Sequence, residues 1–366
     1  MKILIEHFKR LDWILIGSSL ALICFGVLSL YSSSLARGDF SNMTKQLIFL
    51  GIGITLMFLI SFFDYRLLRN DPYFILFLYS IGIFALIGLF LPFVHEIRGI
   101  RAWYRIGPIS VDPIEYIKLI LLILMAKYFS TRHIEAYRIR HIFRTGLYFL
   151  LPTVLIFLQP NLGSVLLLTI MWVVMLLVAG IPLKLFSLIV LTGIMIFAGS
   201  WQFLFESFQK DRILAFIEPE IDPLGIGWNQ LQAKIAVGNG GVLGQGLGKG
   251  TQTQYGFLPE PQTDFIFAAI AEELGFVAVL SLLVFLAILV WRMLQVGLQS
   301  QENFPRLFTA GFVALIITQV GINVGMNLGL LPIIGLPFPL VSYGGSSLIF
   351  TYIGLGILQS IRTHRA

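Results

Sequence analysis

The sequence predicts an all-α protein, a polytopic membrane helix bundle with about ten transmembrane helices. Hydrophobic residues make up 57% of the 366 residues, whereas charged residues make up only 12%. Soluble domains carry about 25% charged residues, and a soluble fold could not bury so much apolar surface. Apolar runs of about 17–25 residues, the length that crosses a bilayer as a helix, recur along the chain. The natural solvent of this chain is therefore a membrane.

Ten segments are predicted to span the membrane within one integral-membrane domain over residues 1–366. The fifth of these segments is short and interrupted by prolines. The first segment is longer than the apolar part of a signal peptide, which favours a retained helix over a cleaved signal. The predicted spans are 13–32, 46–63, 73–93, 114–130, 145–159, 162–180, 183–200, 265–291, 307–329 and 345–361.

The distribution of Lys and Arg predicts the topology. When the N-terminus is placed in the cytoplasm, most of the 25 Lys and Arg residues fall on cytoplasmic segments, as the positive-inside rule requires. Ten spans then return the C-terminus to the cytoplasm. Residues 94–113 and a large extracytoplasmic loop, 201–263, lie outside, and long loops on a rigid scaffold often carry function.

The charge and cysteine content exclude several classes of function. The net charge of +6 reflects loop topology and gives no reason to expect nucleic-acid binding. The single cysteine, Cys24, excludes a disulfide within the chain and a cysteine metal site.

A glycine-rich stretch, residues 238–251, occupies the second half of the long loop. It is not a nucleotide-binding Walker loop, because Leu243 stands where the first glycine belongs and Gly250 follows Lys249. Two interpretations stay open. The stretch is either a flexible loop or a backbone that closes over a ligand, since glycine permits close approach. Lys249 is a candidate substrate-binding residue in the second interpretation.

Asp264 lies at the predicted outer start of the eighth span. Either Thr263 or Asp264 caps the helix, or Asp264 serves as a general base at the membrane surface. Glu272 is expected about 12 Å deeper along the same helix, with Glu273 on the opposite side. Carboxylates at that depth rarely face lipid, so at least one should face the bundle interior.

Further candidates flank the fourth span and the start of the long loop. Glu115 and Lys118 share a helix face and either form an ion pair or let Lys118 bind an anion with Glu115 holding it. Arg101, beside Trp103, either binds phosphate oxygens or anchors the chain at the membrane surface together with that tryptophan. Arg212 could bind a diphosphate or a lipid headgroup. The Pro/Gly-broken segment 335–347 must line a cavity or be buried in protein.

Three motifs together resemble the shape, elongation, division and sporulation family of cell-wall polymerases. They are DPLGIGWNQLQAKIAVGNGG at 222–241, GTQTQYGFLPEPQTDFIFAAIAEELG at 250–275 and LLPIIGLPFPLVSYGGSS at 330–347. The resemblance runs nearly end to end, and residues 250–252 are more similar to the elongation branch than to the division branch. It implies an enzyme of the bacterial plasma (inner) membrane that polymerises lipid II, an undecaprenyl-diphosphate-linked disaccharide-pentapeptide, into glycan strands.

The resemblance also carries residue roles to matching positions. The essential acid of the family falls on Asp264, and its binding residues fall on Arg101, Trp103, Glu115, Lys118 and Arg212. The chain departs from the family patterns at four positions, Asp112, Ile114, Asn161 and Gln262. Asn161 replaces an acid, so a role there that needs charge is not expected. Gln262 replaces a histidine, so proton transfer at that position is not expected either.

The mechanism that the resemblance implies is a single inverting displacement. Asp264 would take the proton from the acceptor hydroxyl. Arg101, Lys118, Arg212 or a divalent cation, Mg²⁺ or Mn²⁺, would stabilise the leaving diphosphate. The implied partners are a class B penicillin-binding protein, which is a transpeptidase, and other membrane proteins of the elongation complex.

Two other functions compete with polymerisation. A lipid II flippase would need charged residues through the depth of the bundle, whereas the candidate residues cluster at the predicted outer face. A pure scaffold for a partner enzyme would not need Asp264 at all.

Overall fold

The structure, a computed structural model, describes residues 2–91, 94, 102–107, 109–132, 139–218 and 225–364. Each of the ten predicted spans overlaps a helix, so the all-α prediction is confirmed. Within the described residues the helices are α1 (Lys2–Arg10), α2 (Trp13–Arg37), α3 (Ser41–Phe62), α4 (Arg66–Asn70), α5 (Pro72–Gly88), α6 (Pro113–Arg132), α7 (Ile139–Phe157), α8 (Leu162–Val178), α9 (Leu183–Phe203), α10 (Ser207–Ile217), α11 (Ile226–Asn239), α12 (Thr251–Gln254), α13 (Ile266–Leu298), α14 (Asn303–Asn327) and α15 (Gly345–Thr363).

Five helices in the described part of the chain are both long and apolar enough to cross a membrane. They are α2, α3, α9, α13 and α14, and α5 and α8 are shorter apolar helices. The helix α6 has a spanning length, but it carries Glu115 and Lys118 near its start. Large apolar side chains such as Phe77, Phe84 and Leu183 are exposed on the outside of the bundle. This surface suits acyl chains, in agreement with a multi-pass membrane protein.

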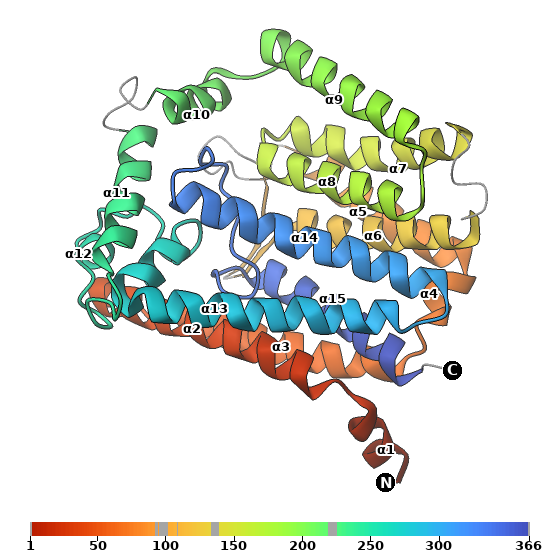
Figure 1. Ribbon diagram of the computed structural model, residues 1–366, viewed down its shortest axis with the longest axis horizontal. Helices are drawn as coiled ribbons and strands as arrows, with labels where there is room; N and C mark the ends of the chain where they lie inside the picture. Colours follow the sequence, from red (N-terminus) through yellow and green to blue (C-terminus); the bar gives the residue numbers. More distant parts are fainter. Residues whose placement is uncertain are drawn as a thin grey trace.

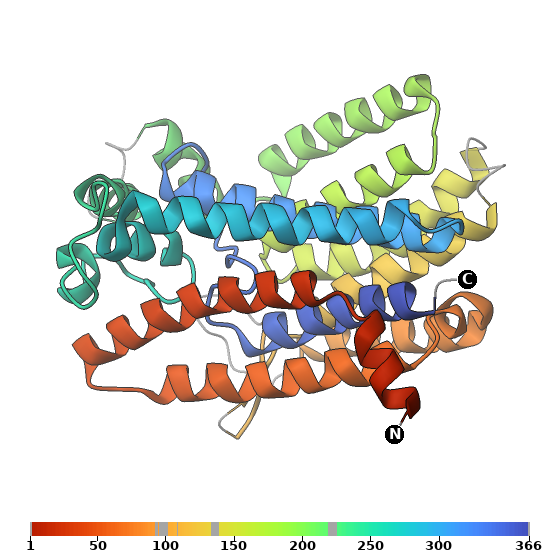
Figure 2. The ribbon, with the colours of Figure 1, turned by 60° about the horizontal axis from the view of Figure 1, so that its bottom comes forward.

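Close helix contacts organise the bundle around α3 and α15. Figure 2 shows α2 and α3 running side by side. A Cβ added at Gly53 would lie 3.0 Å from the Tyr352 ring of α15, and one at Gly356 would lie 3.0 Å from the Met57 backbone of α3. Small residues let membrane helices approach in this way. In contrast, α9 lies at the edge of the bundle and buries none of its side chains (Figure 1).

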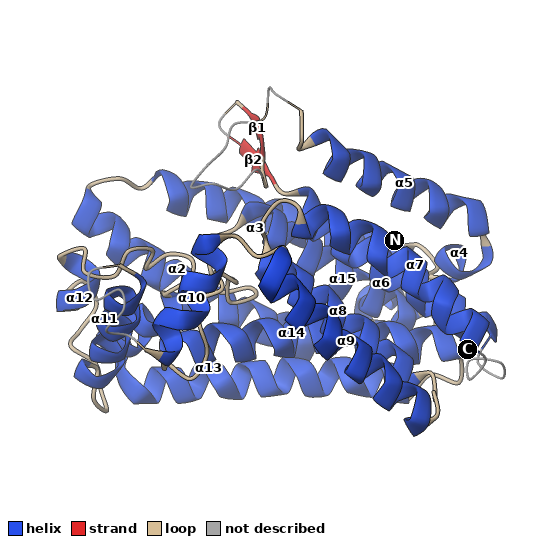
Figure 3. Cartoon of the chain, turned by 90° about the horizontal axis from the view of Figure 1, so that it is seen from above, coloured by secondary structure: helices blue, strands red, loops and turns tan. Residues whose placement is uncertain are grey.

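A two-stranded antiparallel hairpin precedes α6. Strands β1 (Tyr104–Ile106) and β2 (Ile109–Val111) pair Tyr104 with Val111, and Figure 3 shows the hairpin at one side of the bundle beside α5. The Tyr104 hydroxyl donates to the Ala85 carbonyl at 2.6 Å. This bond holds the hairpin against α5 and thereby places the start of α6.

Both chain termini lie at the same end of the bundle, which we call the terminal end (Figure 1). Arg362 Nε donates to the Arg10 carbonyl at 3.0 Å, and the His7 and His364 ring centroids are 6.5 Å apart. The opposite end carries residues 204–218 and 225–265, and we call it the loop end. A chain that crosses the membrane an even number of times has both termini on the same side, as this arrangement shows.

Arginine–carboxylate pairs tie the helices together at the terminal end. Asp12 is 1% exposed; its Oδ2 lies 2.6 Å from Arg292 Nη2 and also pairs with Arg362. Glu302 Oε2 lies 2.6 Å from Arg69 Nη1 and accepts from the Tyr65 hydroxyl at 2.9 Å. These pairs join the start of α2 to α13 and α15, and α4 to the start of α14.

Candidate active site

Helix α13 is broken at Gly275, and the glycine-rich loop fills the break. Gly275 has φ 78° and ψ −176°, and a Cβ there would lie 2.2 Å from Gly244 N. The loop exchanges four backbone hydrogen bonds with the two sides of the break. They are Gln245 N to Glu272 O at 2.9 Å, Gly246 N to Glu273 O at 2.9 Å, Phe276 N to Gly241 O at 3.0 Å and Val277 N to Val242 O at 3.1 Å. The flexible-loop interpretation is therefore wrong, because this backbone replaces the helix hydrogen bonds that the break removes.

The two glutamates of α13 anchor the same loop. Glu272 is fully buried, and its carboxylate accepts from Gln252 N at 2.7 Å and from the Thr253 hydroxyl at 2.7 Å. Glu273 accepts from the Ser32 hydroxyl at 2.6 Å. Both face the interior, as expected for at least one of them. Glu272 lies eight residues after Asp264 in the first turns of α13, and its hydrogen-bond partners belong to the long loop.

Asp264 is held through its backbone. Its carbonyl accepts from Asn323 Nδ2 and from Asn327 Nδ2, each at 3.0 Å. The Ser342 hydroxyl donates to the neighbouring Thr263 carbonyl at 2.6 Å. Helix α13 begins at an N-cap residue, Phe265, without a side-chain capping bond. Neutral donors from α14 and from segment 335–347 thus hold the backbone of Asp264 and Thr263.

Segment 335–347 is non-helical up to Gly345 and buried in protein. Phe338, Leu340 and Val341 are almost fully buried, and Asn323 Nδ2 donates to the Leu336 carbonyl at 2.8 Å. A Cβ built at Gly335 would lie 3.6 Å from Asp264 Oδ2. The glycine therefore leaves room beside that carboxylate, as a substrate site requires.

Arg212, in the long loop, lies within electrostatic range of Asp264. It lies on α10 and is half-buried. Burial lowers the pKa of the Arg212 guanidinium, and the nearby Asp264 carboxylate partly offsets this by raising it. The structure thus brings together a carboxylate and a guanidinium that are about 50 residues apart in the sequence. A guanidinium beside the proposed base is suited to the oxygens of a phosphate group.

Glu115 and Lys118 form the predicted ion pair. Lys118 Nζ lies 2.7 Å from Glu115 Oε1, and the two side chains are only 6% and 14% exposed, respectively. Asp112, just ahead of α6, accepts from Ile114 N at 2.8 Å, and its own N–H donates to the Ser346 hydroxyl at 3.0 Å. Burial first, and then the Glu115 charge, raises the pKa of the Asp112 carboxyl to about 7. The start of α6 therefore holds three interacting ionisable groups.

A polar stripe on α14 connects this ion pair to Asp264. Gln319, Asn323 and Asn327 are spaced four residues apart and so share one helix face. Gln319 lines a small cavity of about 30 Å³ together with Glu115 and Lys118, while the two asparagines hold Asp264. The sequence reasoning missed this stripe. The available signal was three amides inside an otherwise apolar span, where polar residues rarely lie without a role.

Three other positions from the sequence analysis lie within the described residues, namely Trp103, Lys249 and Asn161. Trp103 is half-buried and packs on the core, and Arg101 lies outside the described residues. Lys249 is exposed and forms no ion pair with any other described residue. Asn161 accepts from Ser164 N at 3.1 Å and caps α8. Among the described residues, no three His, Cys, Asp or Glu side chains gather as a preformed metal site would need.

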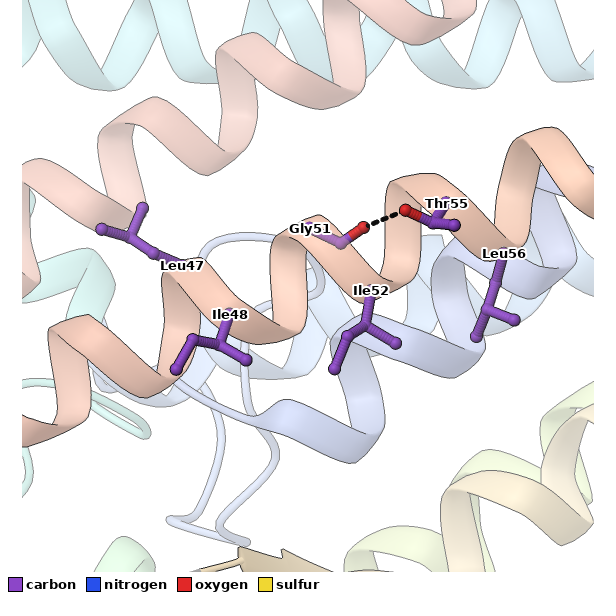
Figure 4. Close-up of a pocket in the computed structure, with 6 residues that line it drawn as sticks. All are labelled: Leu47, Ile48, Gly51, Ile52, Thr55 and Leu56. Carbon is purple, nitrogen blue, oxygen red and sulfur yellow. Dashed lines mark hydrogen bonds between the residues drawn. The ribbon is translucent and has the colours of Figure 1, made fainter.

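A larger groove lies away from these residues. It has a volume of about 390 Å³ and runs along one face of α3, and its lining residues are Leu47, Ile48, Gly51, Ile52, Thr55 and Leu56 (Figure 4). All six belong to a single helix, and the Thr55 hydroxyl donates to its own helix, to the Gly51 carbonyl at 2.8 Å. The groove has no ionisable group and lies outside the candidate site.

Comparison with known proteins places this architecture among cell cycle proteins. The FtsW/RodA/SpoVE family, described as cell cycle proteins, matches residues 12–366. The peptidoglycan glycosyltransferase MrdB of Escherichia coli strain K12 is 34% identical over 347 residues, covering 94% of this chain and 92% of that protein. Stage V sporulation protein E of Bacillus subtilis strain 168 is 34% identical over 358 residues and 96% of each chain.

Solved structures agree with the sequence relatives. A chain from a peptidoglycan synthase complex that coordinates polymerization and crosslinking superimposes with a TM-score of 0.81 at 32% identity, over 96% of this chain and 97% of that one. The rod shape determining protein RodA of Thermus thermophilus gives a TM-score of 0.71 at 30% identity, over 97% of each chain. The likeness therefore extends over nearly the whole bundle.

Proposed function

This chain belongs to the FtsW/RodA/SpoVE family of cell cycle proteins, and from that premise we propose how it acts as a peptidoglycan glycosyltransferase. It polymerises lipid II into glycan strands during cell elongation. Relatives that are themselves peptidoglycan glycosyltransferases align over more than nine-tenths of the chain. The observation that carries the proposal is the arrangement of Asp264, whose backbone is held by two asparagines and whose carboxylate lies within electrostatic range of Arg212.

We propose that the terminal end lies in the cytoplasm and the loop end outside. Arginines and lysines gather at the terminal end, including Lys9, Arg10, Arg69, Arg292 and Arg362. This distribution agrees with the positive-inside rule. Asp264 and the Glu115–Lys118 pair then lie at the outer leaflet, where a lipid-linked sugar presents its diphosphate.

The chemistry is a single displacement at the anomeric carbon of the donor sugar. The acceptor 4-hydroxyl attacks that carbon, the bond from the carbon to the diphosphate oxygen breaks, and the configuration inverts. Asp264 takes the hydroxyl proton. Arg212 and Lys118 stabilise the negative charge that develops on the leaving diphosphate. When Arg212 binds the diphosphate it exchanges one anionic partner for another, which leaves the Asp264 carboxylate able to accept the proton.

A divalent cation, Mg²⁺ or Mn²⁺, fits this proposal as a companion of the diphosphate. Mg²⁺ is usually bound by one or two carboxylates together with substrate phosphates, and Asp264 would be the carboxylate that shares it. The cation would add to the charge stabilisation that Arg212 and Lys118 supply.

The distribution of charge supports polymerisation over flipping. Among the described carboxylates, Asp12 and Glu302 lie at the terminal end, and Glu272 and Glu273 contact the loop at the other end. Between these groups, the second part of α13, from Phe276 to Val290, carries no charged residue. A flippase would need charged groups along this depth.

A class B penicillin-binding protein is the proposed partner, which would cross-link the strand as it forms. The related chain of known structure belongs to a complex of polymerization and crosslinking. On this chain the exposed apolar side chains of α13 and α14, such as Phe276, Leu280, Val284 and Ile317, offer a surface within the membrane, and the long loop continues it outside. Failure of the two folded proteins to co-purify would count against this partner.

The test of the proposed function is the purified chain supplied with lipid II, with and without the transpeptidase. We expect glycan strands longer than the disaccharide unit, together with released undecaprenyl diphosphate. A parallel assay in vesicles follows movement of labelled lipid II between leaflets. Movement without polymer would favour the flippase, and neither activity would favour a scaffold.

A further inference from the structure

Gln319 is a buried amide on the polar stripe of α14. It is 6% exposed, and its Nε2 has no hydrogen-bond partner among the described residues. Leaving a buried donor unsatisfied costs about 1–3 kcal/mol, and most buried polar groups are therefore satisfied by protein or by ordered water. Gln319 belongs to the stripe whose other members hold Asp264. An unexplained donor thus lies within the proposed site.

The cavity beside Gln319 has the size and lining that one water molecule needs. Its volume is about 30 Å³, and Glu115, Lys118, Gln319 and Thr351 contribute to its wall. A site for one water needs roughly 10–15 Å³ and two to four polar partners. The wall supplies an amide donor, a carboxylate acceptor, an ammonium donor and a hydroxyl. A sugar or a phosphate group is too large for this space.

We propose that an ordered water in this cavity accepts a hydrogen bond from Gln319 Nε2 and donates one to the Glu115 carboxylate, which makes Gln319 a positioning residue for polymerisation. Helix α14 then holds both halves of the site. Asn323 and Asn327 hold Asp264 directly, and Gln319 holds the Glu115–Lys118 pair through the water. The distance between the base and the ammonium is thereby set by one rigid element. The effect on rate rests on the proposed function, whereas the water bridge does not.

The competing explanation is a buried amide without any role. Gln319→Met has a similar volume and removes the donor. If the amide has no partner at all, this change removes an unsatisfied group and leaves the melting temperature unchanged or higher. If the amide binds a water that bridges to Glu115, the same change removes two hydrogen bonds and lowers the melting temperature.

The experiment is a double-mutant comparison in detergent. Gln319→Met is made in the wild-type chain and in a background in which both charges are replaced together, Glu115→Leu with Lys118→Met. We expect the melting temperature to fall by roughly 2–4 °C in the wild-type chain and to stay nearly unchanged in the second background, because the water has lost its acceptor. In the wild-type background the rate of lipid II polymerisation should also fall about tenfold.

A matched control lies on the same helix. Thr309 Oγ1 is also buried and lacks a partner among the described residues, but Thr309 does not line the cavity. Thr309→Val should keep both the melting temperature and the rate. An equal fall of melting temperature for Gln319→Met in both backgrounds, or no fall in either, would overturn the water bridge. A normal rate beside the expected melting pattern would overturn the positioning role. If the variants show the expected melting pattern but the wild-type protein forms no polymer, the water bridge stands and the proposed function fails.

Discussion

The two ends of the bundle use carboxylates in opposite ways. At the terminal end, Asp12 and Glu302 are each surrounded by arginines, and their charge joins separate helices. At the loop end, neutral amides and a serine hold the backbone around Asp264, and the charged partner, Arg212, comes from a surface loop. A carboxylate that holds the fold cannot change its partner during a reaction. The comparison shows a structural role for the first set of acids, and it agrees with the chemical role that we propose for Asp264.

The largest expected effect on folding comes from Asp12→Asn. The change leaves Arg292 and Arg362 without their shared acid, and breaking a buried pair by removing one partner costs about 3–5 kcal/mol. Polymerisation per folded molecule should be unchanged. Melting in detergent measures the first effect and glycan formation the second. Asp64→Asn is the control, because its contact with Arg66 is 3.9 Å long and about one-third exposed; equal losses in the two variants would contradict the account.

A change at Asn323 should affect both folding and rate. Asn323→Leu removes the donor to the Asp264 and Leu336 carbonyls, which costs about 1–3 kcal/mol. Because Asp264 then shifts from its position, we expect polymerisation to fall by at least about tenfold. Asn303→Ala, at the opposite end of α14, should have neither effect. If the Asn323→Leu enzyme polymerises at the wild-type rate, the hydrogen bond from Asn323 to the Asp264 carbonyl is not needed for activity.

The pH dependence of stability tests the environment of Asp112. Its pKa is raised from 3.8 to about 7 by burial and by Glu115, so between about pH 4 and pH 7 the folded protein binds more protons than the unfolded chain. Stability from this group therefore falls as the pH rises through that range, and the full penalty is present above pH 7. Asp112→Asn keeps the cap on α6 but cannot ionise. We expect its melting temperature to decline less between pH 5 and pH 8 than that of the wild-type chain; parallel curves would refute the assignment.

The smallest effect is expected at Lys249. Its side chain is exposed on the loop that fills the α13 break. Lys249→Ala should leave melting unchanged and polymerisation within about twofold of wild type, as is usual for surface substitutions. A loss of tenfold or more would support Lys249 as a substrate-binding residue.

The sequence predicts well the features that depend on local patterns. The ten spans follow from apolar length, and the Glu115–Lys118 pair follows from helical spacing. The break at Gly275 could not be predicted, because it depends on backbone hydrogen bonds with residues about 30 positions earlier. The continuous apolar pattern of the eighth span gives no sign of the break.

The asparagines that hold the Asp264 backbone could not be predicted from the sequence either. Asn323 and Asn327 look like polar interruptions of the ninth span, and their partner is a carbonyl that no sequence pattern marks. Asp112 was noted only as a departure from a family pattern. Its interaction with Glu115 depends on burial, which spacing alone does not reveal.

The most direct test of the central claim is the Asp264→Asn variant, measured for both melting and polymerisation. The amide keeps the shape of the side chain. Asn323 and Asn327 bind the backbone carbonyl, which the substitution does not change, so the fold should survive. We predict a melting temperature within about 2 °C of the wild-type value and a rate of glycan formation reduced by about 100-fold or more. Binding of lipid II should persist. A variant that melts normally and polymerises lipid II at the wild-type rate would contradict the assignment of Asp264 as the base.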